Sequence, residues 1–296
     1  MGFYEFVDNY GTSVGGALVK KKYFSEGVES LKIKEWLDLV KLDFPKINGE
    51  GYYPIKVQYN GVINEAAFRI EQWKGVQYPT IIYHHGAAEG SYDFSFNRIL
   101  KKDKSNIKAN LIAIQALFNH SNKEFMDSIL NLSNYTLMLA TSVLIVENII
   151  SQVRKISNNR IIVTGTSLGG FVANLHFTYY NTSDLYKPLL SGARIGDVFI
   201  NSAYSKVTSA NGKKNPDKLR YALNFDEDIK KMEQKNLFPL MAKHDQIVKY
   251  EVQSVDFSLR QITVIPFGHA TGATKFKLLR QHIVKGIEND SEEKKE

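Results

Sequence analysis

RIIVTGTSLGGFVANL, residues 160–175, contains the clearest structural pattern in this sequence. Residues 161–163 form a short run of β-branched side chains, as expected of a strand that is covered on both faces. From Phe171 onward the residues favour a helix with an apolar side. The stretch therefore predicts a buried strand, a tight turn that carries Ser167, and a helix.

The turn in this stretch has the pattern G-x-S-x-G, which is typical of a nucleophile elbow. In such a turn a serine is held in a strained conformation, and small neighbours allow the strand and the helix to approach closely. The chain has the same pattern at residues 11–15, GTSVG, but that copy follows no apolar strand and continues into the charged sequence ALVKKK. We therefore predict that Ser13 lies in a glycine-rich loop and that Ser167 is the nucleophile.

The composition is that of an ordinary folded domain. The chain has 296 residues, 43% of them apolar and 23% charged, which allows one α/β domain with insertions or two smaller domains. The net charge is +7, but the lysines are scattered along the chain. This pattern favours an ordinary solvated basic surface, with a weak general affinity for anions as the alternative. Because no nucleic-acid-binding motif is present, we expect no nucleic-acid partner.

Several chemistries and locations are disfavoured by what the sequence lacks. There are no cysteines, which excludes disulfides, thiol catalysis and cysteine-ligated metals. No spacing of histidines with carboxylates suggests a metal site, and we expect no cofactor. The N-terminus lacks the basic start and apolar core of a signal peptide, and the longest apolar stretch, 137–146, is too short to span a bilayer. These features predict a cytoplasmic protein without a membrane span.

The two ends of the chain are expected to lie outside the main domain. Residues 1–50 predict an N-terminal helical extension, because apolar residues between Val28 and Val40 recur at near-helical spacing. Residues 289–296 are charged and are expected to be disordered. The domain between these ends spans residues 51–288.

The domain begins with a predicted pair of antiparallel strands at residues 53–59 and 67–73. Asn60-Gly61 between them is a strong signal for a hairpin turn. Residues 62–66, however, should make the connection longer than the tightest kind.

The rest of the domain alternates strands and helices. Further strands are expected at residues 80–83, 109–115, 161–163, 197–201, 237–242 and 261–265, and helices at 135–155, from 171, and at 273–287. Ser121 and Glu124 have the spacing of a capping box, which would begin another helix. Residues 205–234 are polar and lysine-rich and form a possible cap insertion over one end of the sheet. The alternation predicts an α/β fold with a mostly parallel central sheet and helices on both faces.

The order of these parts resembles that of the α/β-hydrolase superfamily over about residues 52–287. Members of this superfamily place a serine after the fifth strand, an acid after the seventh and a histidine after the eighth. In this chain Ser167 is followed by Asp245 at the end of one predicted strand and by His269 at the end of the next. The resemblance implies an α/β-hydrolase fold and an esterase-like serine hydrolase with Ser167, Asp245 and His269 as its catalytic triad.

Other histidines and aspartates are less well placed for these roles. The remaining histidines lie on the loop after the strand at 80–83, precede a helix or lie within one: His84, His85, His120, His176 and His282. Asp197 precedes its predicted strand, whereas Asp226 and Asp228 belong to the polar segment 205–234. His244, beside Asp245, is expected to be structural or part of a pocket wall.

The implied chemistry explains why these residue types are needed together. A serine hydroxyl is a poor nucleophile at neutral pH, so His269 would take its proton and later return it to the leaving group. Asp245 would hold the imidazole in the required tautomer. The backbone N–H groups of Leu168, directly after the serine, and of Ala87, in the HGA loop, would form the oxyanion hole.

These residues predict hydrolysis of a carboxylic ester, with a small acyl ester as the substrate. The same triad acts on esters, thioesters and amides, so a thioesterase, a small peptidase and an acyltransferase are alternatives, as is an interaction protein without catalysis. The elbow is also similar to those of acyl-peptide and prolyl-type peptidases and of acetyl esterases. Such peptidases carry an additional propeller domain, for which 296 residues leave no room, and this favours a small esterase.

Overall fold

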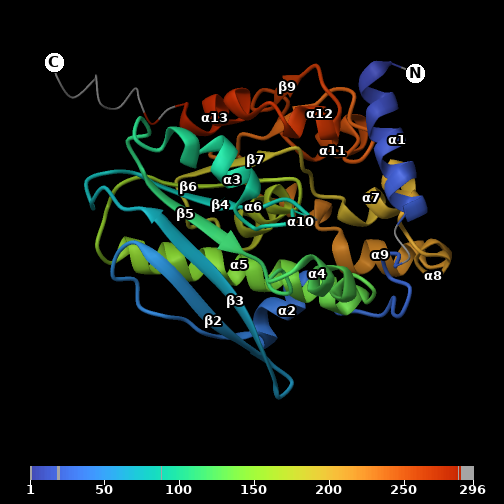
Figure 1. Cartoon of the computed structure of the whole chain (residues 1–296), viewed down its shortest axis with the longest axis horizontal. Coiled ribbons are helices and arrows are strands. Elements are labelled where there is room, and N and C mark those ends of the chain that lie inside the picture. The colour runs from blue at the N-terminus through green and yellow to red at the C-terminus, as the bar shows by residue number, and fades with distance from the viewer. Residues whose placement is uncertain (1, 19–20, 88, 286, 288–296) are drawn as a thin grey trace.

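The computed structural model describes residues 2–18, 21–87, 89–285 and 287, and the tail 289–296 that the sequence predicts to be disordered lies outside them. Within the described residues, strands form one sheet in the order β1-β2-β3-β5-β4-β6-β7-β8-β9 (Figure 1). They are β1 (Lys41–Asp43), β2 (Gly51–Tyr59), β3 (Val62–Gln72), β4 (Thr80–His84), β5 (Asn110–Gln115), β6 (Ile161–Thr166), β7 (Leu185–Leu189), β8 (Leu240–Ala242) and β9 (Thr263–Ile265). The pairs β1–β2, β2–β3 and β3–β5 are antiparallel. The pairs β5–β4, β4–β6, β6–β7, β7–β8 and β8–β9 are parallel. The sheet is therefore mostly parallel, as predicted.

Helices cover both faces of this sheet (Figure 1). They are α1 (Phe3–Leu18), α2 (Ile33–Leu39), α3 (Phe94–Ile99), α4 (Asn122–Ser128), α5 (Leu132–Arg154), α6 (Leu168–Tyr179), α7 (Ile195–Asn201), α8 (Ala210–Lys214), α9 (Pro216–Leu223), α10 (Asp226–Ile229), α11 (Tyr250–Gln253), α12 (His269–Ala273) and α13 (Phe276–Val284). Short 3-10 turns are η1 (Lys101–Asp103), η2 (Ala203–Lys206) and η3 (Ser254–Asp256). α3 and α13 pack on one face, and α2, α5 and α6 pack on the other. The predicted α/β fold class is confirmed.

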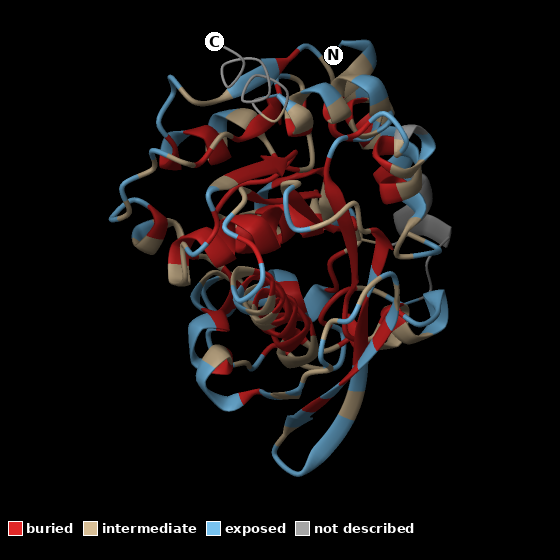
Figure 2. Ribbon diagram, turned by 90° about the vertical axis from the view of Figure 1, so that its left-hand side faces the viewer, coloured by how far each residue is buried: buried red, intermediate tan, exposed pale blue. Residues whose placement is uncertain are grey.

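Alternate residues of the central strands contribute to two separate cores. In β4, Ile82 packs with α5 and α6, whereas Ile81 and Tyr83 pack with α3 and α13. Ile112 of β5 and Ile162 of β6 likewise belong to opposite cores. Figure 2 shows the buried residues concentrated in the sheet and in the helices that pack on it. Because both faces are covered, these strands are apolar along their length, which is why the sequence displays them as continuous apolar runs.

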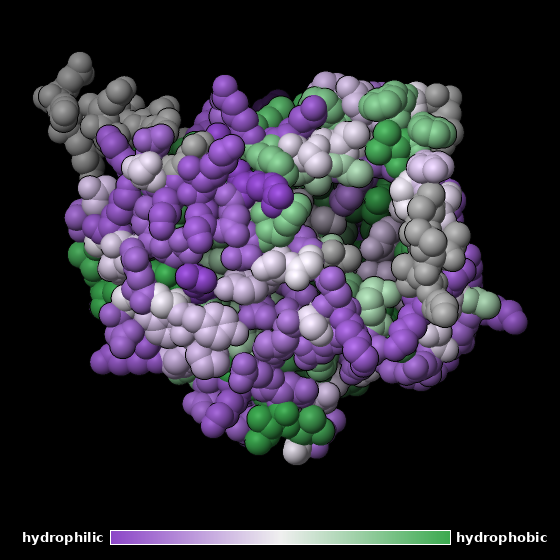
Figure 3. Space-filling model, viewed as in Figure 1, coloured by the Kyte–Doolittle hydropathy of each residue, from purple (hydrophilic) through white to green (hydrophobic). Residues whose placement is uncertain are grey.

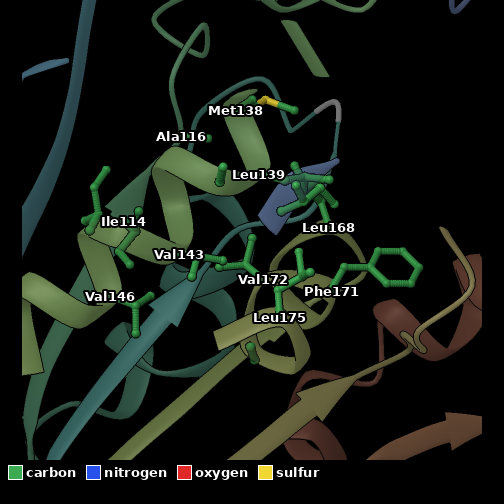
Figure 4. Packing of buried hydrophobic residues seen from close by; sticks show 14 of the residues in the cluster. Ile114, Ala116, Met138, Leu139, Val143, Val146, Leu168, Phe171, Val172 and Leu175 are labelled. Atoms are coloured by element: carbon green, nitrogen blue, oxygen red, sulfur yellow. The ribbon is translucent and has the colours of Figure 1, made fainter. Parts of the chain in front are cut away.

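Helix α6, which follows the serine, packs against α5. Leu168, Val172 and Leu175 of α6 lie beside Val143 and Val146 of α5 in the main core (Figure 4). All five side chains are fully or almost fully buried. This packing fixes the position of the helix whose first residue adjoins Ser167.

The apolar helix α5 is a core helix of this domain. Within the described residues it is the one helix that is long and apolar enough to cross a membrane by length and composition. However, 72% of its most apolar window is buried inside the protein. Its apolar side therefore faces the sheet and α6.

Helix α1 occupies a segment where the sequence predicted a loop. It continues through residues 11–15, the first copy of G-x-S-x-G, and Ser13 is exposed on it. The Ser13 hydroxyl donates a 2.6 Å hydrogen bond to the backbone carbonyl of Asn9, one turn earlier. Packing of α1 against α12 and η2 outweighs the weak helix preference of its glycines, so the prediction of a loop was wrong.

The second helix of the N-terminal extension is shorter than predicted. Val28 is buried, but the helix α2 begins only at Ile33. The backbone carbonyl of Gly27 instead accepts a 2.9 Å hydrogen bond from the N–H of Leu132. Pairing with a distant segment thus replaces the first helical turn that the apolar spacing suggested.

The hairpin of β2 and β3 is tighter than predicted. Tyr59 pairs directly with Val62, so the connection consists of Asn60 and Gly61 alone. Both turn residues have positive φ, 46° and 76°, as a type I′ turn requires. Residues 62–66 belong to β3 rather than to the connection.

The strand predicted at residues 197–201 was wrong, because Ile195–Asn201 form helix α7. The strand that follows α6 is β7, whose sequence LYKPL contains a lysine and a proline. Lys187 is buried, and its ammonium donates hydrogen bonds to the backbone carbonyls of His282 (2.9 Å) and Ile283 (3.1 Å) near the end of α13. Carbonyl groups at the end of a helix therefore stabilise this buried charge. Because the prediction looked for apolar runs, it missed a strand that contains a lysine.

Candidate active site

Ser167 lies at the junction of β6 and α6 in a strained conformation. Its backbone angles are φ 53° and ψ −107°, outside the regions that serine normally adopts. The Ser167 N–H donates a 2.9 Å hydrogen bond to the carbonyl of Leu189 in β7. This strand, sharp turn and helix are those predicted, and the strained serine is the feature that defines a nucleophile elbow.

The glycines around Ser167 permit a close approach to the neighbouring strand. A side-chain carbon at Gly169 would lie 2.0 Å from the carbonyl oxygen of His84, at the end of β4. One at Gly165 would lie 2.6 Å from the same oxygen. Both distances are shorter than any van der Waals contact, so packing requires glycine at the two outer positions of the pattern.

The structure brings Ser167, His269 and Asp245 together. His269 is the first residue of α12, and its Nε2 lies 3.0 Å from the Ser167 hydroxyl oxygen. Its Nδ1 lies 2.7 Å from Oδ2 of Asp245, which follows β8. The other oxygen of Asp245 accepts hydrogen bonds from the N–H groups of Ile247 (2.8 Å) and Val248 (2.7 Å). The predicted serine, base and acid therefore form one continuous set of hydrogen-bond distances.

Burial and neighbouring charges shift the pKa values of Asp245 and His269. Burial raises the pKa of the Asp245 carboxyl, although the adjacent His269 counteracts part of that effect. Burial by itself lowers the pKa of His269, but the Asp245 carboxylate, together with Asp8 of α1, outweighs that effect, so the pKa of His269 is raised overall. His269 thus binds a proton more readily than an ordinary histidine, which suits a general base.

The loop after β4 borders the same site. Ala87 and Leu168, the predicted oxyanion-hole residues, both line the cavity that contains Ser167 and His269. The neighbouring N–H of Gly86 is engaged, because it donates a 2.6 Å hydrogen bond to Oε1 of Glu89. The use of the Ala87 and Leu168 N–H groups as donors to an oxyanion stays a prediction.

A buried polar network that the sequence did not reveal supports this loop. Glu89 accepts hydrogen bonds from the backbone N–H (2.8 Å) and the hydroxyl (2.7 Å) of Ser95 in α3. The Tyr83 hydroxyl lies 2.8 Å from Ser95 Oγ and 2.8 Å from the hydroxyl of Thr166, the residue before Ser167. The loop at Gly86 is thereby connected to the elbow through side chains. The one sequence signal for Glu89 was its position in the stretch HGAAEG, which follows the strand β4.

His84, at the end of β4, and His85, the first residue of this loop, have structural partners. His84 Nε2 lies 2.9 Å from the hydroxyl of Ser142, and His85 Nε2 accepts a 3.2 Å hydrogen bond from the N–H of Ala116. Burial lowers the pKa of both residues, that of His85 to about 4. Both are therefore neutral near pH 7 and hold the loop on the sheet.

The other rival residues also lie in contacts away from Ser167. His176 Nε2 lies 3.1 Å from Glu147, His282 Nε2 donates to the carbonyl of Phe238 at 2.9 Å, and His120 Nδ1 lies 3.1 Å from Glu124. Asp197, Asp226 and Asp228 form ion pairs with Arg220 (3.0 Å), Arg194 (3.0 Å) and Lys231 (3.1 Å). His244 is half-exposed and stacks on Tyr4 of α1. Within the part of the chain that the structure describes, no group of His, Cys, Asp and Glu could hold a metal ion.

Ser167 and His269 border a cavity of about 300 Å³. Its aromatic lining residues are Tyr23, Phe94, Tyr135, Phe171, Phe199, Tyr204 and Phe276. The Phe199 ring is central among them, with ring centroids 5.0 Å from Tyr23, 5.5 Å from Tyr135 and 5.7 Å from Tyr204. The site beside the serine is therefore mainly apolar.

The wall of this cavity comes from α7 and η2 rather than from the segment 205–234. Among the described residues, none from 205–234 lines the cavity. Leu219, Leu223 and Ile229 of that segment are buried in the main core. Residues just before the segment, including Val198 and Phe199, supply the wall instead.

Comparison with solved structures identifies the fold. No protein-family model and no curated protein matches the sequence. An acylaminoacyl peptidase of Pyrococcus horikoshii matches with a TM-score of 0.56 and 14% identity, over 83% of this chain and 42% of its own. AbyA5 matches with a TM-score of 0.52 and 10% identity, over 83% of this chain and 72% of its own. Acetyl xylan esterase 1 of a Thermoanaerobacterium species has a TM-score of 0.49 and 14% identity, with 83% and 91% covered.

These similarities concern the fold alone, because all the identities are low. This chain has the α/β-hydrolase fold, as the order of its motifs predicted. It spans less than half the length of the peptidase that it matches, 42%. The fold is one that hydrolases share, and the activity of this chain has to be argued from its own site.

Proposed function

We propose that this protein is a serine hydrolase that cleaves a carboxylic ester through an acyl-enzyme intermediate. The observation that carries the proposal is the pair of distances from Ser167 to His269, 3.0 Å, and from His269 to Asp245, 2.7 Å. A serine, an imidazole and a buried carboxylate in this order are the groups that acyl transfer needs. The strained turn at Ser167 supports the same assignment, because it exposes the hydroxyl to the cavity.

In the first half-reaction Ser167 Oγ attacks the carbonyl carbon of the ester. His269 Nε2 accepts the serine proton, and Asp245 stabilises the imidazolium through its hydrogen bond to Nδ1–H. The negative oxygen of the tetrahedral intermediate accepts hydrogen bonds from the N–H groups of Leu168 and Ala87. The bond to the alcohol then breaks, and the alcohol leaves with the proton from His269.

The second half-reaction repeats these steps with water. A water molecule attacks the carbonyl carbon of the acyl-enzyme while His269 accepts one of its protons. The bond between Ser167 and the acyl group breaks, and the serine oxygen recovers the proton from His269. The carboxylic acid leaves and the enzyme returns to its starting state.

An apolar acyl group suits the cavity beside Ser167. The lining is mainly aromatic and aliphatic, and the cavity volume is about 300 Å³. Because burial contributes about 0.8 kcal/mol for each CH₂ group, kcat/KM should increase with acyl length until the cavity is filled. A maximum at a short or intermediate chain length is therefore expected.

A fluorophosphonate probe and a panel of p-nitrophenyl esters test the proposal. The wild-type protein should be labelled and should hydrolyse the esters, and Ser167→Ala should do neither. Ser13→Ala is the matched control, because Ser13 occurs in the same sequence pattern but is exposed on α1. Failure of the wild-type protein to react, or loss of reaction in Ser13→Ala instead, would show that the proposed function is wrong. Added alcohols or amines distinguish hydrolysis from acyl transfer by their products.

A further inference from the structure

Helix α1 packs on the domain with a charged side chain turned inward. Asp8 is 1% exposed, whereas Phe3 and Phe6 on the same helix are 71% and 53% exposed. Figure 3 shows hydrophobic residues gathered on the surface at the upper right, where α1 lies in Figure 1. Hydrophobic burial alone would turn the phenylalanines inward and the carboxylate outward. The hydrogen bonds of Asp8 therefore help to set the orientation of α1.

Asp8 accepts hydrogen bonds from backbone N–H groups on two different loops. Its Oδ2 accepts from His269 at 2.7 Å and from Gln246 at 3.1 Å. Its Oδ1 accepts from Ala270 at 3.0 Å. These charge-assisted bonds compensate the buried carboxylate for the water that it has lost. Two of the donors lie in the first turn of α12, where N–H groups lack partners within the helix.

The two loops that Asp8 joins carry the acid and the base of the active site. Gln246 directly follows Asp245, and the other loop donates through His269 itself. We propose that Asp8 is a positioning residue, which holds these two loops in register so that His269 is aligned between Asp245 and Ser167. Helix α1 is then a working part of the active site, although it lies outside the segment that resembles α/β-hydrolases. The inference rests on the proposed function.

Gly268 shows how closely α1 approaches the histidine loop. A side-chain carbon at Gly268 would lie 2.7 Å from Oδ2 of Asp8 and 2.9 Å from the backbone carbonyl oxygen of Tyr4. Any larger residue would therefore push α1 away from the loop. The glycine that precedes His269 in the sequence makes room for this contact.

Aromatic contacts from the same helix reach both loops. The Tyr4 ring packs edge-on against Phe267 at 5.4 Å between centroids, and stacks on His244 at 6.0 Å. Glu5 Oε1 lies 3.7 Å from Nδ1 of His244. On the acid's loop, α1 therefore contacts His244 before Asp245 and Gln246 after it. On the base's loop, it contacts Phe267 before His269 and Ala270 after it.

Asp8 also adds negative charge next to His269. Asp245, on the loop after β8, is hydrogen-bonded to the imidazole, Asp8 of α1 accepts from the backbone N–H of His269, and Glu89 lines the same cavity. Burial lowers the pKa of His269, whereas Asp245 and, to a smaller extent, Asp8 raise it. Removal of the Asp8 charge should therefore lower the pKa of His269. This shift reports how close the Asp8 charge lies to His269, whereas turnover reports the alignment of the imidazole.

The decisive variant is Asp8→Asn, which keeps the shape of the side chain but removes its charge and one acceptor atom. We expect kcat/KM for a p-nitrophenyl ester to fall on the order of tenfold to a hundredfold, mainly through kcat, because small displacements of reacting groups have effects of this size. We also expect the His269 imidazole, followed by NMR titration without substrate, to titrate at lower pH than in the wild-type protein. Ser13→Ala, on the same helix, is the control that should change neither quantity.

A folded Asp8→Asn variant with wild-type turnover would overturn the inference, whatever its His269 titration. If that variant does not fold, Gly268→Ala decides instead, because it keeps the Asp8 charge and forces the contact apart. A folded Gly268→Ala variant should lose turnover, and unchanged turnover would again overturn the inference. The NMR titration needs no substrate, so a protein that has no esterase activity but shows the pKa change would refute the proposed function and not the contact.

Discussion

The backbone N–H of Gly86 donates a 2.6 Å hydrogen bond to Oε1 of Glu89, three residues further along the chain. The same carboxylate accepts two hydrogen bonds from Ser95 at the start of α3. Glu89 therefore ties the loop that carries Ala87 to the body of the domain. Since oxyanion donors act only when they are held in place, the rigidity of this loop should matter for turnover.

Replacement of Glu89 by alanine tests that relationship. Glu89→Ala leaves the N–H groups of Gly86 and Ser95 without their acceptor, so the loop should shift and the Ala87 N–H should move with it. We expect kcat to fall by at least about tenfold with a smaller change in KM, given that loss of one oxyanion donor costs about 10²–10³ in kcat. Steady-state kinetics on one p-nitrophenyl ester measures this.

Asp93→Asn is the control for Glu89→Ala. Asp93 lies close to Glu89 in sequence and is hydrogen-bonded to Ser91 rather than to Gly86. This control should retain wild-type kcat. An equal loss in both variants, or no loss in a folded Glu89→Ala protein, would contradict a role for Glu89 in holding the loop.

The raised pKa of His269 sets the expected pH dependence. As pH falls through this pKa, the imidazole gains a proton and can no longer act as a base. Burial lowers the pKa of His269, but Asp245 and Asp8 together raise it by more, so the decline should be centred above the ordinary histidine value of about 6.5. The measurement is kcat/KM between about pH 4 and pH 9, with circular dichroism to confirm that the protein stays folded. A flat profile from neutral pH to about pH 4 would exclude a histidine base.

The two copies of G-x-S-x-G allow a matched test of the elbow. Gly165→Ala places a carbon 2.6 Å from the backbone of both Gly169 and His84, whereas nothing lies within 4 Å of a carbon at Gly11. We expect Gly165→Ala to lower the free energy of unfolding by about 1–3 kcal/mol or more, as overpacking does. Gly11→Ala, within α1, should raise it by about 0.5–1 kcal/mol because alanine favours a helix. Chemical denaturation of the two variants decides between these signs.

The residues of the site that could be predicted are those that follow recognisable strands. Ser167, Asp245 and His269 each follow an apolar strand, and parallel strands bring their carboxyl ends to one edge of the sheet. Their order along the chain resembles that of the α/β-hydrolase superfamily, and this resemblance grouped them. The strand, turn and helix at residues 160–175 could also be predicted, because each is indicated by residues within that stretch.

The features that the sequence did not reveal depend on contacts between distant segments. Asp8 is 261 residues from the N–H of His269 to which it binds, and no local pattern relates the two. The strand β7 was not predicted because it contains Lys187, and a charged residue is not expected in a buried strand. The Lys187 ammonium is accommodated by hydrogen bonds to carbonyls of α13, which lie far along the chain. Helix α1 contains glycines that argue against a helix, and it is stabilised by packing. In each case a tertiary contact outweighed the local preference.

Substrate preference should depend on Phe199, which is central to the aromatic lining of the cavity. Phe199 is 2% exposed and packs on the rings of Tyr23 and Tyr135. Phe199→Ala removes that ring and enlarges the cavity beside Ser167, at a cost in stability of about 3–5 kcal/mol. We expect the optimum in a series of p-nitrophenyl esters to move to longer acyl chains, because short chains lose contacts and long chains gain room.

Leu223→Ala is the control that separates cavity shape from loss of stability. Leu223 is 0% exposed in α9 and packs in the main core, but it does not line the cavity. Its replacement should cost about 2–5 kcal/mol, a comparable loss, and should leave the ranking of the esters unchanged. Both variants are assayed well below their melting temperatures, with kcat/KM determined for each chain length. A ranking that changes in Leu223→Ala as much as in Phe199→Ala would mean that the apolar wall at α7 does not select the acyl group.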